Sequence, residues 1–328
     1  MMIDIFAHII PLKYIEAVKR LSLINPDYID RTRSLSDLDI RFRIMDKYDA
    51  YLQVLTIPGF HRVIAEGKEK SVELAKMAND SMAELVSKYP DRFVAAVASL
   101  PLNDMDAALK EAERAINDLH FRGVEIWATN EKPLDMPEFM PLYEEMCRYN
   151  LPIWIHPMRM PSVPDYTNEK ESKYGINSLF GWVYETTTAM TRLVFGQVLQ
   201  KYPDIKFITH HCGAMIPYLS ARIVSHYDNY EMIWGRTYNR GLTKHPIEYF
   251  RMFYNDTAVN GNTAALNCGY DFFGVERLLF ATDMPFDSQL GDVSIRETIR
   301  SIEEMDIPDV EKKMIFEDNA RRLMRLPV

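Results

Sequence analysis

The segment that decides the fold is LLFATDMPF, residues 278–286, in which a short β-prone run stops at an acidic residue, Asp283. The run has no polar alternation, which is typical of a strand buried on both faces of a parallel sheet. Seven similar runs precede it, at residues 2–6, 52–57, 93–100, 123–127, 152–156, 205–210 and 252–259. Eight such strands separated by helices predict an α/β protein with a (β/α)8 TIM barrel fold.

Helical patterns lie between these runs. Apolar residues recur at helical spacing over 74–86 and again over 108–119, and we expect Asn103 to be the N-cap of the second helix. The sequence KYPD occurs twice, at 88–91 and 201–204, each time before a strand. Because proline disfavours helical backbone before it, we expect both helices to end there.

No linker, low-complexity tract or change of composition marks a domain boundary, so we expect residues 1–328 to form a single domain. Two connections are unusually long, residues 158–182 after the fifth strand and residues 215–249 after the sixth. Both follow strand C-terminal ends, where barrel active sites form. We therefore expect these long loops to be lids, binding loops or subunit contacts.

Composition limits the classes of function. Hydrophobic residues make up 47% of the 328 residues, which is enough for a large core, and the formal net charge of -9 disfavours a nucleic acid partner. The sequence has no apolar stretch near the roughly 18 residues of a membrane span, and no glycine-rich loop for a nucleotide cofactor. Three scattered cysteines, and a first segment that resembles a strand more than a signal peptide, predict a cytoplasmic location.

Polar residues suited to metal or proton chemistry stand at the ends of four predicted strands. They are His8 after the first run, His156 at the end of the fifth, His210 and His211 at the end of the sixth, and Asp283 after the eighth. A single histidine in an apolar run is usually a hydrogen-bonded core residue, but four coincident strand ends meet at one face of a barrel. Imidazole nitrogen and carboxylate oxygen suit a divalent cation such as zinc, manganese or iron.

Adjacent strand residues point to opposite faces, so the two neighbouring histidines are expected to have different roles. His211 is our candidate for the imidazole that accepts or donates a proton, because a nearby cation favours its neutral form. His210 is expected either to support the site from outside the ligand set or to be a structural hydrogen-bonding residue in the barrel wall.

Five motifs together resemble the amidohydrolase-2 family, over essentially the whole chain. They are Asp4-Ile5 before His8, Ile155-His156-Pro157, His211-Cys212-Gly213 leading to Pro217-Tyr218 and Arg222, Thr282-Asp283-Met284-Pro285, and Asn319-Ala320-Arg321-Arg322-Leu323. That family includes aminocarboxymuconate-semialdehyde, γ-resorcylate and 5-carboxyvanillate decarboxylases, as well as hydrolases and hydratases. The motifs are specific for the superfamily and do not identify a substrate.

The resemblance implies one divalent metal ion bound by His8, His156 and Asp283, with His211 and Asp283 as catalytic residues. Zinc is the metal that we favour, with manganese as the alternative. Members of the family usually have His or Glu two residues before the strand-one histidine, where this chain has Phe6. The result is either a ligand triad completed by water molecules, which we favour, or a weakened site that holds metal poorly or not at all.

Candidate substrate contacts come from the loops and strand ends. Arg222 and Arg159 suit a substrate carboxylate, and Arg222 fits a family position that sometimes serves the neighbouring subunit, although it is equally suited to an ordinary ion pair. Trp182 and Tyr184 can stack on a planar ring, or else belong to the core or an interface. Glu185 either orients a ligand or the catalytic imidazole, or favours a helix N-terminus.

The resemblance implies non-oxidative decarboxylation of a small aromatic or unsaturated carboxylic acid by a homodimer or homotetramer. The alternative on the same residues is hydrolysis of a lactone, an amide or a C–C bond by metal-activated water, with Asp283 as general base. A third hypothesis is a barrel that has lost both its metal and its catalysis, which the apolar Phe6 would permit.

Overall fold

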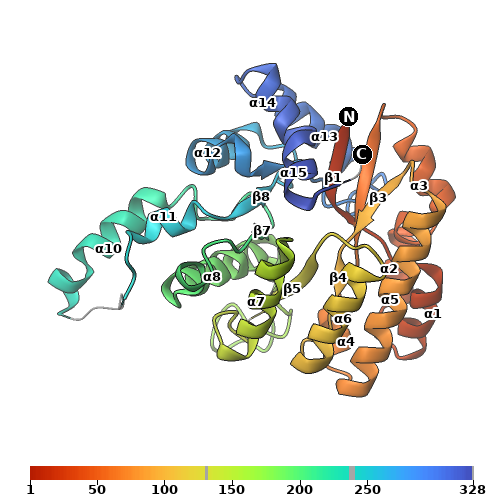
Figure 1. Cartoon of the computed structure of the whole chain (residues 1–328), viewed down its shortest axis with the longest axis horizontal. Coiled ribbons are helices and arrows are strands. Elements are labelled where there is room, and N and C mark those ends of the chain that lie inside the picture. The colour runs from red at the N-terminus through yellow and green to blue at the C-terminus, as the bar shows by residue number, and fades with distance from the viewer. Residues whose placement is uncertain (130–131, 236–240, 327–328) are drawn as a thin grey trace.

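The computed structural model describes residues 1–129, 132–235 and 241–326, and parallel strands form its centre (Figure 1). The strands are β1 (Met2–His8), β2 (Tyr51–Thr56), β3 (Phe93–Ala96), β4 (Ala98–Ser99), β5 (Val124–Thr129), β6 (Ile153–Met158), β7 (Phe207–Thr209), β8 (Tyr254–Asp256) and β9 (Leu278–Leu279). They pair in parallel in the orders β1-β2-β3 and β4-β5-β6-β7-β8-β9. All eight predicted runs contain a strand, and the third run contains two.

Two junctions join these strands into one ring. β3 and β4 belong to a single run interrupted at Val97, after which the Ala98 N–H donates to the Gly123 carbonyl beside β5 at 3.0 Å. At the other junction, the Ile5 N–H of β1 donates to the Phe280 carbonyl just after β9, also at 3.0 Å. The predicted (β/α)8 barrel is therefore confirmed.

Helices follow the strands around this ring. They are α1 (Leu12–Arg20), α2 (Pro26–Arg31), α3 (Leu38–Met45), α4 (His61–Ile64), α5 (Lys68–Lys88), α6 (Met105–Asn117), α7 (Met140–Tyr149), α8 (Trp182–Phe195), α9 (Val198–Lys201), α10 (Ser220–Trp234), α11 (Pro246–Phe250), α12 (Thr263–Phe273), α13 (Asp292–Glu303), α14 (Asp309–Lys313) and α15 (Asn319–Met324). α5 and α9 end at Lys88 and Lys201, as the repeated KYPD sequence predicts. None of the helices in the described ranges is long and apolar enough to cross a membrane.

The N-cap predicted for α6 is wrong by one residue. The side chain of Asp104, not that of Asn103, accepts a hydrogen bond from the Ala107 N–H at 3.2 Å. Asn103 is used elsewhere, because its side chain accepts from the Ser71 hydroxyl and donates to the Ile64 carbonyl, both at 2.7 Å. Asn103 is thus engaged in tertiary contacts with α4 and α5, which leaves the next residue, Asp104, to cap the helix.

The inside of the barrel is closed by buried side chains below the strand ends. Trp154 of β6 is fully buried, and its indole N–H donates to the Ile5 carbonyl of β1 at 3.1 Å. Because β1 and β6 are not neighbours in the ring, this bond crosses the interior. Trp154 shares a hydrophobic cluster with Phe6, Ile208 and Leu279. This packed floor gives the residues at the strand ends a rigid support.

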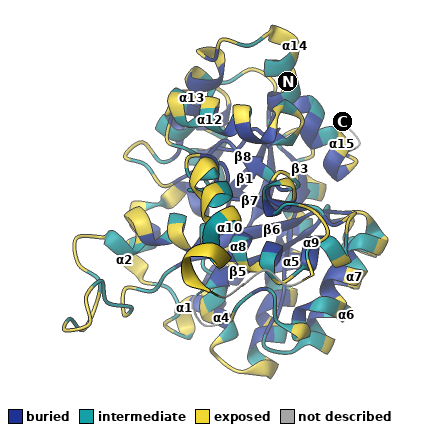
Figure 2. Ribbon diagram, turned by 90° about the vertical axis from the view of Figure 1, so that its left-hand side faces the viewer, coloured by how far each residue is buried: buried dark blue, intermediate teal, exposed yellow. Residues whose placement is uncertain are grey.

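The two long connections differ in what they contain. Residues 159–181 end in a π-helical turn, Asn177–Gly181, that leads into α8. The connection after β7 contains α10 and α11, and Figure 1 shows α10 extending away from the barrel. None of the 15 residues of α10 is buried (Figure 2).

Candidate metal and catalytic site

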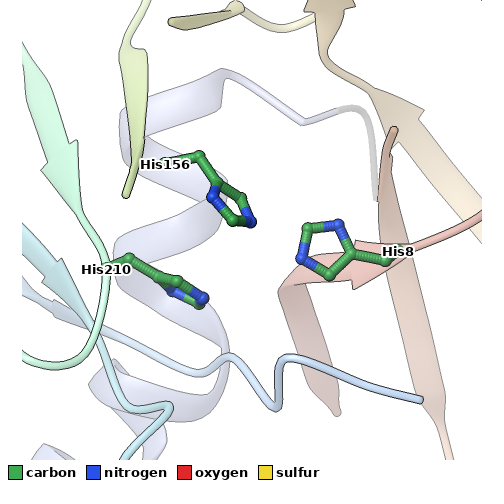
Figure 3. A group of neighbouring side chains, drawn as sticks. All are labelled: His8, His156 and His210. Carbon is green, nitrogen blue, oxygen red and sulfur yellow. The ribbon is translucent and has the colours of Figure 1, made fainter. Parts of the chain in front are cut away.

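Three imidazoles from different strands converge at the C-terminal end of the barrel. His8 ends β1, His156 lies in β6 and His210 directly follows β7, and all three are buried. One ring nitrogen of each lies within 4.8 Å of the others, and the rings face a common space (Figure 3). The parallel strands produce this convergence, because their carboxyl ends share one face of the barrel.

The second nitrogen of each ring already has a partner. Nδ1 of His8 lies 2.8 Å from the Thr56 hydroxyl, and Nδ1 of His156 lies 2.8 Å from the Pro157 carbonyl. Nδ1 of His210 contacts the Asp256 carboxylate. The Nε2 atoms of His8 and His210 are buried and face the Asp283 carboxylate. Nε2 is thus the atom that each of these two rings has available for a ligand.

Asp283 brings a carboxylate to the same place. Its Oδ1 lies 3.0 Å from Nε2 of His8 and 3.4 Å from Nε2 of His210. Burial alone would raise the pKa of Asp283, but the charge on His210 and hydrogen bonds from His210 and His8 lower this pKa well below its ordinary value. Asp283 is therefore an anion, and it also groups with His210 and His211 at ligand spacing.

Burial and neighbouring carboxylates give the imidazoles different charges. It lowers the pKa of His8, and it lowers the pKa of His156 further, with help from the neighbouring His8 and His210. Burial, followed by repulsion from His210, lowers the pKa of His211 to about 4. For His210 the carboxylates of Asp256 and Asp283 outweigh burial and raise the pKa to about 10. Of these four imidazoles, only that of His210 is therefore stabilised in its protonated, positively charged form.

These residues fit a divalent cation. Neutral imidazole nitrogens and an ionised carboxylate are the donors that zinc and manganese accept. The buried Nε2 atoms of His8 and His210 both face Oδ1 of Asp283, so donor atoms of these three residues meet at one point, where a divalent cation would be bound.

Phe6 lies among the three imidazoles. Its ring stacks on His210 with 4.2 Å between the ring centroids, and it meets His8 and His156 edge-on at 5.3 and 5.7 Å. The side chain has no donor atom, so it packs beneath the polar cluster and cannot bind a cation.

A pocket of about 700 Å³ opens above the cluster. Its wall includes His156 and Asp283 together with mostly apolar residues from the segments around α1, α2 and α4. Trp182, Tyr28 and Phe286 supply aromatic surface, and the Trp182 indole nitrogen is buried without a hydrogen-bond partner among the described residues. An apolar cavity with a few polar groups at its base suits a small organic ligand.

The residues expected to contact substrate are spread more widely. Trp182 lines the pocket, whereas Tyr184 is 54% exposed and lies outside the pocket wall, as far as the wall is described. Arg159 forms an ion pair with the buried Glu185 at 2.8 Å, so each of these residues neutralises the other. Arg222 lies exposed on α10, away from this pocket.

Two contributors were missed from the sequence. Asp256, at the end of β8, orients His210, and His61, at the start of α4, lines the pocket with both ring nitrogens buried and unpartnered among the described residues. Asp256 was missed because the predicted run, 252–259, extends past it, whereas β8 ends at Asp256. His61 lies four residues beyond the predicted strand 52–57, where the pattern gave no signal.

Comparison with known proteins places this arrangement in a family. The family model described as amidohydrolase matches residues 3–326. The γ-resorcylate decarboxylase of Rhizobium sp. (strain MTP-10005) is 30% identical over 303 residues, covering 90% of this chain and 89% of that protein. The 2-amino-3-carboxymuconate-6-semialdehyde decarboxylase of Dictyostelium discoideum is 29% identical over 292 residues, covering 88% of this chain and 77% of that protein.

Solved structures of similar fold also include decarboxylases. The 5-carboxyvanillate decarboxylase of Sphingomonas paucimobilis aligns with a TM-score of 0.81 and 26% identity, covering 99% of both chains. The dihydroxybenzoic acid decarboxylase of Polaromonas sp. JS666, solved with manganese and the inhibitor 2-nitroresorcinol, gives the same TM-score and identity, covering 99% of this chain and 96% of that one. The chain belongs to the amidohydrolase family of barrel proteins.

Proposed function

We propose that this protein catalyses the metal-dependent, non-oxidative decarboxylation of a small aromatic carboxylic acid. The observation that carries the proposal is the convergence of buried imidazoles and the Asp283 carboxylate at the base of a largely apolar pocket. Relatives named as decarboxylases of resorcylate, carboxymuconate semialdehyde and methylsalicylate support the reaction class.

His8, His156 and Asp283 are the proposed metal ligands. A divalent cation held there supplies a positive charge that binds the substrate's carboxylate or neighbouring hydroxyl and stabilises negative charge as it develops. The manganese bound in the Polaromonas structure supports manganese as the metal, whereas zinc is favoured from the sequence alone. Three protein ligands leave positions open for substrate.

Asp283 is the proposed proton carrier. Because its pKa lies well below the ordinary value, Asp283 is ionised before substrate enters and has to take up a proton first. A bound hydroxyl or carboxyl group of the substrate is the available source. Asp283 then delivers this proton to the ring carbon that bears the carboxylate. The bond between this carbon and the carboxylate breaks, its electron pair returns to the ring, and carbon dioxide leaves. The partly buried His211, whose lowered pKa of about 4 keeps it neutral, is the second group that can accept or return a proton.

The pocket supports a planar substrate. Trp182, Tyr28 and Phe286 offer aromatic faces, and the apolar wall limits the access of water to the reacting ring carbon. Arg62 and Arg31 also line the pocket and offer positive charge for a carboxylate.

A homo-oligomer is part of the proposal. α10 has no buried residue, yet Met232, Ile233 and Trp234 are 78%, 62% and 60% exposed at its C-terminal end. Exposed apolar residues grouped in this way are typical of a protein interface. We propose that α10 packs against a second copy of the chain and that Arg222 serves the neighbouring subunit's pocket.

Carbon dioxide release tests the function. Protein purified without chelators is incubated with manganese or zinc and a panel of hydroxybenzoates and carboxymuconate-like acids. We expect carbon dioxide and the decarboxylated product from at least one acid, and loss of activity on chelation that added metal restores. Metal-dependent hydrolysis of lactones or amides without carbon dioxide release would contradict the proposal, as would absence of any metal-dependent turnover.

A further inference from the structure

We propose that Asp4, near the start of β1, is a positioning residue that holds the Asp283 carboxylate beside His8. This inference rests on the proposed function of Asp283 and deepens it. Asp4 is fully buried and is not part of the described pocket wall, so it acts through the segment of chain that carries Asp283.

The backbone of Asp283 explains why such support is needed. Its φ is 57°, in the left-handed region that residues with a side chain rarely adopt. Aspartate tolerates this conformation better than most residues, but it persists at a single position only where the surrounding structure holds it. If this φ relaxed, the side chain would turn with the backbone, and Oδ1 would leave its place 3.0 Å from Nε2 of His8.

The side chain of Asp4 binds the residue just before Asp283 at two atoms. The Thr282 N–H donates to Oδ1 of Asp4 at 3.1 Å, and the Thr282 hydroxyl donates to Oδ2 at 2.5 Å. The same hydroxyl accepts a hydrogen bond from the Met284 N–H at 3.2 Å. One carboxylate thus fixes both chain neighbours of Asp283, Thr282 directly and Met284 through the hydroxyl.

The backbone of β1 holds the same segment at a second point. The His8 N–H donates to the Met284 carbonyl at 3.1 Å. β1 therefore carries His8 at its end and, four residues earlier, the Asp4 side chain that acts on Asp283. A single strand in this way sets the distance between the two proposed metal ligands His8 and Asp283.

Asp4 is itself held on all sides. Its Oδ1 also accepts from the Phe6 N–H at 3.1 Å, where β1 shifts its register against β2, and its Oδ2 accepts from the Tyr51 hydroxyl at 2.5 Å. Together with the two bonds from Thr282 these are four donors, about as many as an ionised carboxylate accepts. Asp4 therefore has no lone pair left for a metal or a substrate, and its contacts serve the position of the chain.

Variants of Thr282 test the proposal without removing a buried charge. Thr282→Val keeps the shape of the side chain but loses the hydroxyl, whereas Thr282→Ser retains the hydroxyl. We expect Thr282→Val to lower kcat by about 10–100-fold with little change in KM, and to weaken manganese binding by a similar factor, because a contact behind a metal ligand is lost. Thr282→Ser should recover most of both losses. Wild-type kcat and manganese affinity in a folded Thr282→Val protein overturn the proposal.

Tyr51→Phe is the matched control. It removes one hydrogen bond from the same Asp4 carboxylate but leaves both bonds to Thr282. We expect a lower melting temperature with unchanged kcat and manganese affinity. If Tyr51→Phe and Thr282→Val lose kcat and affinity equally, the contacts of Asp4 are merely structural and the proposal is overturned.

Crystal structures of the metal-free wild type and of Thr282→Val need no turnover. We expect Oδ1 of Asp283 to lie near 3.0 Å from Nε2 of His8 in the wild type and clearly farther away in Thr282→Val. An unchanged distance overturns the proposal. A longer distance in the variant, without carbon dioxide release by the wild type, would support the role of Asp4 and reject the decarboxylase. Carbon dioxide release with an unchanged distance would do the reverse.

Discussion

The two ends of the connection after β7 show opposite behaviour. Its first residues, His210 and His211, lie in the candidate metal and catalytic site, where His210 contacts two carboxylates. Ten residues later α10 begins, and none of its residues is buried. Barrel geometry fixes a side chain that directly follows a strand, whereas the position of α10 relative to any pocket depends on what packs against it. The first region therefore supports chemistry within one chain, and the second is suited to contact with another chain.

The largest effect is expected at the strand ends. Asp283→Asn keeps the shape of the side chain but cannot accept the proton or hold the negative charge, so carbon dioxide release should fall by about 10³-fold. The measurement is kcat/KM on the best substrate, with the melting temperature as a check of folding. Asp306→Asn, at an exposed aspartate, is the control and should keep full activity. Wild-type kcat/KM in Asp283→Asn would remove this residue from the mechanism.

A smaller effect, on assembly, is expected at α10. Trp234→Glu places a charge in the apolar end of the helix, and loss of a buried tryptophan at an interface costs about 2 kcal/mol, or roughly 30-fold in the dissociation constant. Sedimentation velocity should show a shift toward monomer with an unchanged melting temperature of the separated chain. Glu231→Gln, on the same exposed helix, should assemble normally. If Trp234→Glu assembles like the wild type, α10 is not the interface.

Arg222 connects the two regions. If it reaches the neighbouring pocket, Arg222→Ala should raise KM by about 10-fold with little change in kcat, because one charge-assisted contact to the substrate carboxylate is lost. Mixing Arg222→Ala chains with inactive Asp283→Asn chains should restore part of the activity, since a mixed dimer contains one complete site. Normal KM in Arg222→Ala would confine this arginine to a surface role.

The smallest effect concerns stability and pH. Burial lowers the pKa of the pocket residue His61 to about 4, against about 6.5 in the unfolded chain. Between these values the unfolded state binds more protons, so the free energy of unfolding falls as the pH drops from 7 to 5, by about 1.8 kcal/mol for this residue. Urea denaturation should show that His61→Phe removes this part of the pH dependence, whereas His120→Asn retains it. An unchanged pH dependence in His61→Phe would show that His61 is protonated in the folded protein.

The fold could be predicted because most strands lie within short, largely apolar runs, and because the helices at 68–88 and 105–117 repeat apolar residues at helical spacing. The residues at which helices begin and end were predicted less well, as the N-cap of α6 shows. Asn103 and Asp104 are both good caps by type, and only the contacts of Asn103 with Ser71 and Ile64 determine which residue caps the helix.

The part of the candidate site that lies near the ends of the strands could be predicted from the sequence. His8 ends β1, His156 lies two residues before the end of β6, and Asp283 follows the end of β9 by four residues, so all three are near the carboxyl ends of their strands and their convergence could be expected from chain position. The roles of His210 and His211 could not be separated by strand alternation, because β7 ends at Thr209 and the chain turns with φ of 58° at His211 and 53° at Cys212. Both rings can then lie near Asp283. Loop residues follow no periodicity, so the ion pair between Arg159 and Glu185 could not be predicted from a sequence pattern.

The most direct test of the central claim is anomalous X-ray diffraction from crystals grown with manganese. We predict one anomalous peak per chain at the C-terminal end of the barrel, within bonding distance of His8, His156 and Asp283. A chain with no peak there, or with its manganese bound elsewhere, would contradict the account.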